Sequence, residues 1–439
     1  MKVLVLGGGS TGEHFVGALR RLDPDVELTL VESRLVGGEC SYFACMPTKT
    51  MLRAAELSSS LDRAPGLEPE RPRPEGVWQW RDWVVDARDD HGQVEWLAGQ
   101  RCELVRGLGR VERPGVVSVE GAGELEYDRL VIATGSRPAI PPIDGLDGVE
   151  YWTNIEATSV EEVPRTLAVL GGGPVGAELA QFFSRVGSRV TVIEHGPRLL
   201  GRVHEEAGEL VGKAFAEDGI DVRTGVAVER AEHGPSNNVV LGLSNGETVE
   251  AERLLVATGR RPNVEGLEGL GLTIGRTGIE VDERCRAGES VWAIGDITGV
   301  ALFTHVGKYQ ARVAAADLAG RDVRADYRAI PAGIFTDPEV ATVGVTEGVS
   351  ARWELTSTPR LSTYERPKRD GFVRLFADPH ERTLVGAVAV GPQATEWLGQ
   401  LTLAVRAQTP IDVLLDTIQP YPTFSEAIFL ALRELADAF

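Results

Sequence analysis

The sequence has only four cysteines among 439 residues. A disulfide scaffold is typical of short, cysteine-rich secreted chains, so this number indicates redox chemistry or burial instead. The sequence also lacks an apolar run of about 18 residues, which a membrane-spanning helix needs. We expect no signal peptide, because a strand pattern begins at Lys2 and leads directly into a glycine loop. These absences favour a cytoplasmic protein that has no membrane partner.

Positive charge is scarce as well. The sequence has 45 Lys and Arg against 65 Asp and Glu, which gives a formal net charge of -20. This balance argues against nucleic acid and anionic membranes as partners. The length exceeds what one hydrophobic core supports and indicates three or four domains.

A dinucleotide-binding pattern opens the chain. Residues 2–6 form an apolar run typical of a buried parallel strand, and Gly7, Gly9 and Gly12 follow as a G-x-G-x-x-G loop. A helix is predicted to about residue 21, then a strand over residues 26–31 that ends at Glu32. The loop amides and the helix N-terminus suit a pyrophosphate, and the acid suits ribose hydroxyls.

The same pattern recurs later in the chain. A strand over residues 166–170 precedes Gly171, Gly173 and Gly176, and a second strand ends at Glu194. Each copy has a later echo, Ala-Thr-Gly at residues 133–135 and at residues 257–259. This internal duplication predicts two nucleotide sites in one chain.

A possible redox pair lies in the stretch 37–49. Cys40 and Cys45 are separated by four residues, about one helical turn, so we expect both sulfurs near one helix face. A thiol at a helix N-terminus is shifted toward the reactive thiolate. The alternative is two small core residues, but the preceding dinucleotide fingerprint favours a redox pair. Cys102 and Cys285 are predicted to be non-catalytic.

The rest of the chain carries weaker signals. Trp78, Trp80 and Trp83 suit either a substrate platform or helix packing, and we favour packing. From about Asp326 the pattern changes to antiparallel strands and then helices, which indicates a separate α+β domain. The strands are predicted at 339–343, 371–376 and 383–390, and the helices at 395–408, 411–415 and 425–438.

These motifs together resemble the class I flavoprotein disulfide reductases, which include glutathione reductase, lipoamide dehydrogenase and mercuric reductase. The resemblance covers essentially the whole chain. It implies an α/β protein with two Rossmann-like dinucleotide-binding domains, one for FAD and one for NAD, plus a C-terminal α+β dimerisation domain. The implied boundaries are 1–156 and 265–325 for the FAD-binding domain, 157–264 for the NAD(P)-binding domain and 326–439 for dimerisation.

The resemblance also implies roles for single residues. Cys45 is the implied charge-transfer thiol and Cys40 the interchange thiol, and Lys49 pairs with Glu178 near the flavin. A solvated surface pair is the alternative for Lys49 and Glu178, as a structural histidine is for His305. The implied cofactor-binding residues are Gly7, Gly9, Ser10, Thr11, Gly12, Glu32, Ser33, Gly38, Glu39, Lys49, Ala133, Thr134, Gly135, Gly171, Gly173, Val175, Gly176, Glu194, Gly259, Gly295, Asp296, Phe303, Thr304 and His305.

One motif departs from the family. Glutathione reductase and lipoamide dehydrogenase carry His-Pro-Thr-x-x-Glu, whereas this chain has Tyr421 at the first position and Glu426 at the last. An imidazole titrates near pH ~6.5 and exchanges protons, whereas a phenol near pH ~10 mostly donates a hydrogen bond. Mercuric reductase also carries Tyr here. Its C-terminal cysteine pair and N-terminal metal-binding domain have no counterpart in this sequence, which argues against the mercury interpretation.

The resulting hypothesis is an FAD-dependent NAD(P)H oxidoreductase that acts as a homodimer. Electrons pass from NADH through FAD to Cys40 and Cys45, and on to a small-molecule disulfide, thiol adduct or metal ion. Glu194 favours NADH, while Arg198 and Arg202 leave NADPH possible. The alternatives are a diaphorase-like quinone or dye reductase that acts at the flavin, and a non-enzymatic redox sensor. We assign no residues to a metal site.

Overall fold

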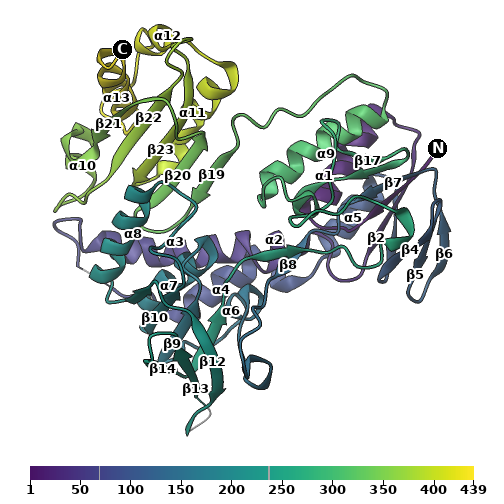
Figure 1. Ribbon diagram of the computed structural model, residues 1–439, viewed down its shortest axis with the longest axis horizontal. Coiled ribbons are helices and arrows are strands. Elements are labelled where there is room, and N and C mark those ends of the chain that lie inside the picture. Colours follow the sequence, from purple (N-terminus) through teal and green to yellow (C-terminus); the bar gives the residue numbers. More distant parts are fainter. Residues whose placement is uncertain (69, 236–237) are drawn as a thin grey trace. The chain divides into compact units, whose positions relative to one another are not determined.

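The computed structural model describes residues 1–68, 70–235 and 238–439, and the chain divides into two compact units. The first unit consists of residues 1–47, 80–139 and 259–326, and the second of residues 48–79, 140–258 and 327–439 (Figure 1). Helices α3 (Cys45–Leu61) and α4 (Pro74–Val84) each contain a boundary between these segments. Within the described ranges, no helix is long and apolar enough to cross a membrane.

A six-stranded sheet forms the core of the first unit, in the order β17-β18-β7-β1-β2-β3. All neighbouring strands are parallel except the edge strand β17. Both faces of β1 are covered, because Val3 to Leu6 are each at most 4% exposed. The strands are β1 (Lys2–Leu6), β2 (Glu27–Glu32), β3 (Cys102–Arg106), β7 (Arg129–Ile132), β17 (Arg286–Gly288) and β18 (Val291–Ala293).

Different elements cover the two faces of this sheet. Helices α1 (Ser10–Leu22) and α9 (Thr304–Leu318) lie side by side on one face (Figure 1). The other face packs against a small antiparallel sheet that the sequence did not predict. That sheet consists of β4 (Gly109–Arg113), β5 (Val116–Val119) and β6 (Gly123–Glu126).

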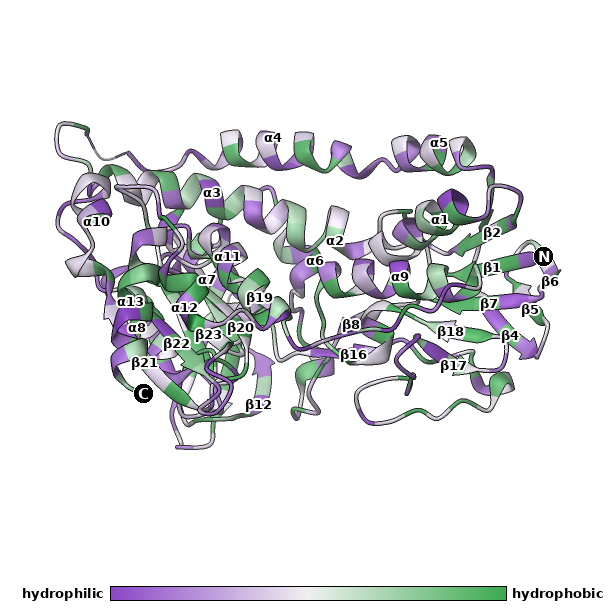
Figure 2. Cartoon of the chain, turned by 90° about the horizontal axis from the view of Figure 1, so that it is seen from above, coloured by the Kyte–Doolittle hydropathy of each residue, from purple (hydrophilic) through white to green (hydrophobic). Residues whose placement is uncertain are grey.

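The remaining elements of the first unit are short. Helices α2 (Gly38–Tyr42) and α5 (His91–Gly99) follow β2 and precede β3, respectively. Strands β8 (Ser136–Pro138) and β16 (Arg260–Pro262) pair with each other, so the segments after the two Ala-Thr-Gly echoes meet. Helix α4 alternates hydrophobic and hydrophilic residues (Figure 2). Its Trp78 packs on Phe182 as predicted, whereas Trp83 is 77% exposed.

A second parallel sheet lies in the second unit, in the order β11-β10-β9-β15. Its strands are β9 (Thr166–Leu170), β10 (Arg189–Glu194), β11 (Asp221–Thr224) and β15 (Arg253–Val256). An antiparallel sheet of β12 (Val228–His233), β13 (Val239–Leu243) and β14 (Thr248–Ala251) accompanies it, which repeats the plan of the first unit. The helices are α6 (Asn154–Ala157), α7 (Pro174–Arg185) and α8 (Glu205–Glu217).

The C-terminal part of the second unit is an antiparallel sheet, in the order β19-β20-β23-β22-β21. Its strands are β19 (Pro331–Ile334), β20 (Glu339–Gly344), β21 (Val349–Glu354), β22 (Phe372–Ala377) and β23 (Leu384–Gly391). The three predicted strands are confirmed, whereas β19 and β21 were missed. Their sequences, Pro-Ala-Gly-Ile and Val-Ser-Ala-Arg-Trp-Glu, carry weak strand signals. The helices are α10 (Pro359–Tyr364), α11 (Ala394–Ala407), α12 (Ile411–Leu415) and α13 (Ser425–Asp437).

Candidate functional site

The glycines of the first loop have two different functions. Gly7 has φ +108°, and a Cβ there would lie 2.3 Å from the Ala133 carbonyl oxygen. A Cβ on Gly12 would lie 2.1 Å from the Gly7 carbonyl oxygen, so both glycines are needed for packing. Gly9 differs, because the nearest atom to its Cβ position is the Gly38 Cα at 4.0 Å. Gly9 therefore leaves room for a ligand to approach the backbone.

Glu32 is fixed at the end of β2. The Gly8 N–H donates to its Oε2 at 2.7 Å, and the Arg34 N–H donates to its Oε1 at 2.7 Å. A carboxylate held this way keeps further lone pairs that can accept hydrogen bonds from ribose hydroxyls.

A cleft of about 390 Å³ opens along the carboxyl ends of these strands. Most predicted residues of the first unit line it, and the structure therefore brings them together. They are Gly7, Gly9, Ser10, Thr11, Glu32, Ser33, Gly38, Glu39, Cys40, Ala133, Thr134, Gly135, Gly295, Asp296 and Thr304. Gly12 lies beneath the loop, Phe303 and His305 stack on each other with ring centroids 5.1 Å apart, and His305 is exposed.

The cleft wall also contains polar residues that the sequence reasoning missed. Arg260 pairs with Glu39 at 2.6 Å and donates to the Ser136 hydroxyl at 2.7 Å, and Ser136 donates to Asp296 at 2.6 Å. Burial raises the pKa of Asp296, although the Ser136 hydrogen bond and Arg260 oppose this. The sequence carries one signal for Ser136 and Arg260, namely that each residue directly follows an Ala-Thr-Gly echo.

The cysteine pair does not lie on one helix, so that prediction was wrong. Cys40 belongs to α2, which is followed by Phe43 with φ -138°, and Cys45 is the first residue of α3. A continuous helix would need the N–H of residue 47 to bond to the Phe43 carbonyl, but residue 47 is proline. The chain therefore restarts the helix, and Cys45 lies at the positive end of a 17-residue helix.

The two sulfurs meet at a third residue instead. The Thr304 hydroxyl donates to the Cys40 Sγ at 3.0 Å and lies 3.6 Å from the Cys45 Sγ. A hydrogen bond with the Cys45 thiol and burial raise the pKa of the Cys40 thiol far above its usual range.

Lys49 and Glu178 form an ion pair within the second unit. The Lys49 Nζ lies 2.6 Å from the Glu178 Oε2, and the Phe335 N–H donates to the Glu178 Oε1 at 2.9 Å. The lysine ammonium also lies 5.0 Å from the centroid of the Phe335 ring. Glu178 is only 3% exposed, so this is not a solvated surface pair.

The second glycine loop repeats the geometry of the first. Gly171 has φ +106°, a Cβ on Gly176 would lie 1.9 Å from the Gly171 carbonyl oxygen, and Gly173 has open space around its Cβ position. Val175, in the first turn of α7, is 40% exposed. The Gly172 and Gly196 N–H groups each donate to the Glu194 carboxylate at 2.7 Å, as Gly8 and Arg34 do to Glu32. Gly259 belongs to the first unit, where it has φ +122°.

The C-terminal motif lies just before and at the start of α13. Tyr421 is 71% exposed, and Glu426 is the second residue of the helix. The Glu426 Oε2 is buried and has no hydrogen-bond partner among the described residues. A buried carboxylate oxygen is costly to leave unsatisfied, so this atom is suited to a donor from outside the chain.

Comparison with known proteins identifies the family of this chain. Residues 1–319 match the family described as pyridine nucleotide-disulphide oxidoreductase, and residues 330–432 match its dimerisation domain. Dihydrolipoyl dehydrogenase 2 of Haloarcula marismortui is 33% identical over 97% of this chain and 95% of that protein. A mercuric reductase of Acidithiobacillus ferrooxidans is 33% identical over 99% of this chain and 82% of its own length.

Two solved structures have a fold similar to that of this chain. LpdA of Mycobacterium tuberculosis has a TM-score of 0.89 at 26% identity, with 99% of both chains covered. The HOCl-induced flavoprotein disulfide reductase RclA of Escherichia coli shares the fold, with a TM-score of 0.87 at 22% identity and 99% of both chains covered.

The chain belongs to the pyridine nucleotide-disulphide oxidoreductase family. It is a flavoprotein oxidoreductase, and the family implies FAD and a pyridine nucleotide as cofactors. The first cleft fits FAD, because Gly9 leaves its loop open and Glu32 offers acceptors at the end of β2. The dimerisation domain at residues 330–432 supports a homodimer.

Proposed function

We propose that this protein reduces a small-molecule disulfide or thiol adduct with electrons from NADH, through the Cys40–Cys45 pair. The observation that carries the proposal is the Thr304 hydroxyl, which lies within 3.6 Å of both sulfurs at the edge of the dinucleotide cleft. FAD, when bound there, would supply the two electrons that the nicotinamide delivers as a hydride. Gly7, Gly9, Gly12, Glu32 and their neighbours in the cleft would hold it.

The cysteines then act in a balanced exchange. The Cys40–Cys45 disulfide takes up two electrons and two protons and becomes a dithiol. Cys40, as thiolate, attacks one sulfur of the substrate disulfide and releases the first substrate thiol. Cys45 then attacks Cys40 in this mixed disulfide, which releases the second thiol and restores the internal disulfide. We assign the stable thiolate to Cys45, since it begins α3 and since the pKa of Cys40 is raised.

The exchange also needs a group that moves protons. We propose Tyr421 and Glu426, contributed across the homodimer, for this position, with Tyr421 in place of the histidine that the related family members use. The buried Glu426 Oε2 has no hydrogen-bond partner in the part of the chain that the structure describes. This supports the assignment, because the atom can orient a group on the second subunit. We also propose that the Lys49–Glu178 ion pair assists hydride transfer from the nicotinamide.

NADH is the proposed electron donor. The Glu194 carboxylate is fixed at the end of β10 and would repel a 2′-phosphate. The Arg198 guanidinium donates to the backbone carbonyls of Leu200 at 2.9 Å and Val203 at 2.8 Å, and these donors are therefore already used within the chain. Arg202 is exposed and leaves NADPH as the alternative donor.

A Cys40→Ser variant tests the proposal. NADH oxidation is measured with a panel of disulfides, quinones and Hg(II), for the wild type and the variant. We expect the variant to lose turnover with the disulfide that the wild type prefers. If it retains full turnover with the best acceptor of the panel, that acceptor takes electrons directly from the flavin, and the protein is a diaphorase-like reductase instead.

A further inference from the structure

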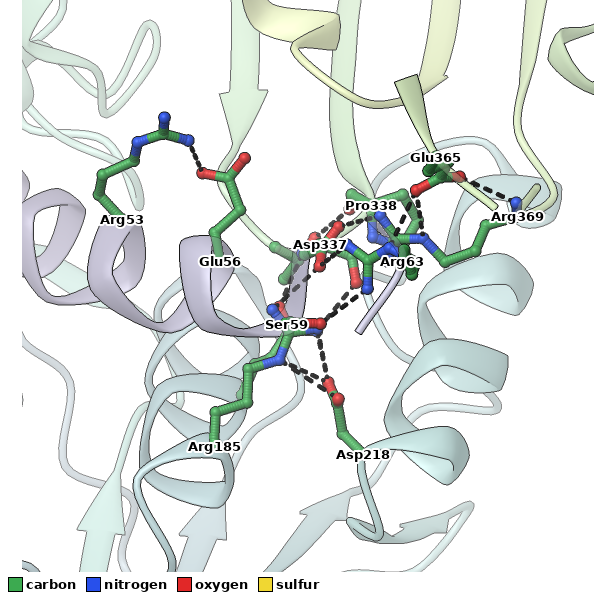
Figure 3. Close-up of polar contacts among 12 residues, drawn as sticks. Arg53, Glu56, Ser59, Arg63, Arg185, Asp218, Asp337, Pro338, Glu365 and Arg369 are labelled. Carbon is green, nitrogen blue, oxygen red and sulfur yellow. Dashed lines mark hydrogen bonds and ion pairs between the residues drawn. The ribbon is translucent and has the colours of Figure 1, made fainter. Parts of the chain in front are cut away.

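Six charged side chains of the second unit form a buried network that the proposed reaction does not use. We call it the Asp337 cluster. Figure 3 shows Arg63, Arg185 and Arg369 converging on Asp337 from different elements. The cluster consists of Arg63, Arg185, Asp218, Asp337, Glu365 and Arg369.

Each charged side chain of the cluster contacts at least one side chain of opposite charge. Arg63 lies 3.1 Å from Asp337 and 2.9 Å from Glu365, and Arg185 lies 3.0 Å from both Asp337 and Asp218. Arg369 completes the ring by pairing with Asp337 and Glu365. Three cations therefore balance three anions.

Loss of one charge from this cluster is expected to destabilise the folded protein. Asp337 is only 6% exposed, and Glu365 is 5% exposed. Burial alone would raise the pKa of Asp337, but Arg369, Arg185 and Arg63 outweigh it and hold that pKa well below its usual range. Removing one partner of a buried ion pair is strongly destabilising, because it leaves an uncompensated charge.

Helix α7 connects the cluster to the Lys49–Glu178 pair. Gln181, one turn after Glu178, accepts from the Asp337 N–H at 2.7 Å and donates to the Asp337 carbonyl at 2.9 Å. The Phe335 N–H, two residues earlier, donates to the Glu178 Oε1. The segment from Phe335 to Asp337 is therefore bound to one face of α7 by two adjacent side chains.

Helix α3 is held at two points by the same groups. Lys49 contacts Glu178 and the Phe335 ring, and Arg63 contacts Asp337. Lys49 lies in the first turns of α3, and Arg63 follows the last residue of this helix, Leu61, by two positions. A helix attached at both ends cannot rotate or slide without breaking one of the two contacts.

We propose that Asp337 is a positioning residue that fixes the Lys49–Glu178 ion pair by locking α3 and the segment 335–337 onto α7. The inference rests on the proposed function, in which this ion pair serves hydride transfer. It assigns Arg63 and Gln181 the same positioning role.

The test observes Lys49 directly. The chain has five lysines, namely Lys2, Lys49, Lys213, Lys308 and Lys368. Reductive methylation of the FAD-loaded enzyme with ¹³C-formaldehyde gives each of them an NMR signal. The dimethylated ammonium keeps its charge and one donor. Lys49→Arg identifies the Lys49 signal, and Glu178→Gln shows its position without the ion pair.

We expect Asp337→Asn to move the Lys49 signal toward its position in Glu178→Gln. Asp370→Asn is the matched control, since it breaks the exposed Lys213–Asp370 pair. It should move the Lys213 signal and leave Lys49 unchanged. Arg63→Gln is the second variant, because it releases α3 and leaves Arg185 and Arg369 for Asp337. It should shift Lys49 in the same direction.

Kinetics supply a second readout. Stopped-flow reduction of the bound flavin by NADH should slow by about tenfold in Arg63→Gln, within the ~10²-fold that a 1 Å misplacement can cost, while the Kd for NADH stays constant. An unchanged Lys49 signal in folded Asp337→Asn, or in Arg63→Gln if Asp337→Asn does not fold, overturns the proposal. The NMR result does not depend on the electron acceptor. Failure of the disulfide proposal is therefore recognised separately, by Cys40→Ser.

Discussion

Replacement of Glu194 by alanine tests how the second nucleotide site distinguishes its cofactor. The Glu194 carboxylate accepts backbone N–H bonds from Gly172 and Gly196 at 2.7 Å, and its side chain is 13% exposed. A hydrogen bond to a charged group contributes about 1.5–3 kcal/mol. Loss of one such bond from the ribose therefore weakens NADH binding by about 10- to 150-fold, because 1.4 kcal/mol corresponds to a factor of ten.

NADPH should respond differently to the same change. Its 2′-phosphate gains from removal of the carboxylate charge, so we expect NADPH binding to stay constant or improve. The Kd values of both cofactors are measured by stopped-flow reduction of the bound flavin. Glu32→Ala is the matched control, since Glu32 has the same environment in the first unit, and it should lower FAD retention without changing the NADH to NADPH ratio. An equal loss for both cofactors in Glu194→Ala would refute the reasoning.

Four further predictions concern the first cleft, the C-terminal motif and Glu13, an acidic residue in the first turn of α1. Gly9→Val should fold but lose FAD, because a Cβ there meets no protein atom closer than 4.0 Å and the side chain blocks the approach to the loop; purified protein with one FAD per chain would contradict this. Cys45→Ser should lack the long-wavelength absorption band that two-electron reduction produces in the wild type, and a persistent band would assign the thiolate elsewhere. Tyr421→His should raise disulfide reductase turnover by about 10²-fold if the position needs an acid–base group, whereas unchanged kcat and KM in both Tyr421→His and Tyr421→Phe would show that it only fills the interface. Burial raises the pKa of Glu13 to about 7 from 4.5, so wild-type stability should fall from pH 4.5 to 7 relative to Glu13→Gln, and parallel Tm profiles of the two proteins would show that Glu13 does not titrate in this range.

Most elements of the fold could be predicted from the sequence, because they depend on local patterns. The apolar runs before each glycine loop predict buried parallel strands, and β1 and β9 begin and end at the predicted residues. The acids Glu32 and Glu194 could be assigned because a carboxylate must follow the second strand of each repeat. The small sheets β4–β6 and β12–β14 were missed, since their strands are short and partly exposed.

Tertiary structure alone decided how residues distant in the chain meet. The cysteine spacing is compatible with a single helix, and only the break at Phe43 places the sulfurs on two helices with Thr304, about 260 residues later, between them. Arg260 and Asp296 likewise join Glu39 on one wall through side-chain contacts between separate elements of the first unit. The Asp337 cluster is the clearest case, since its charges come from five separate segments and only burial makes their mutual contacts strong. Local sequence determines which strand or helix forms, because propensity and periodicity act over a few residues, whereas long-range ion pairs and hydrogen bonds depend on the packing of whole elements.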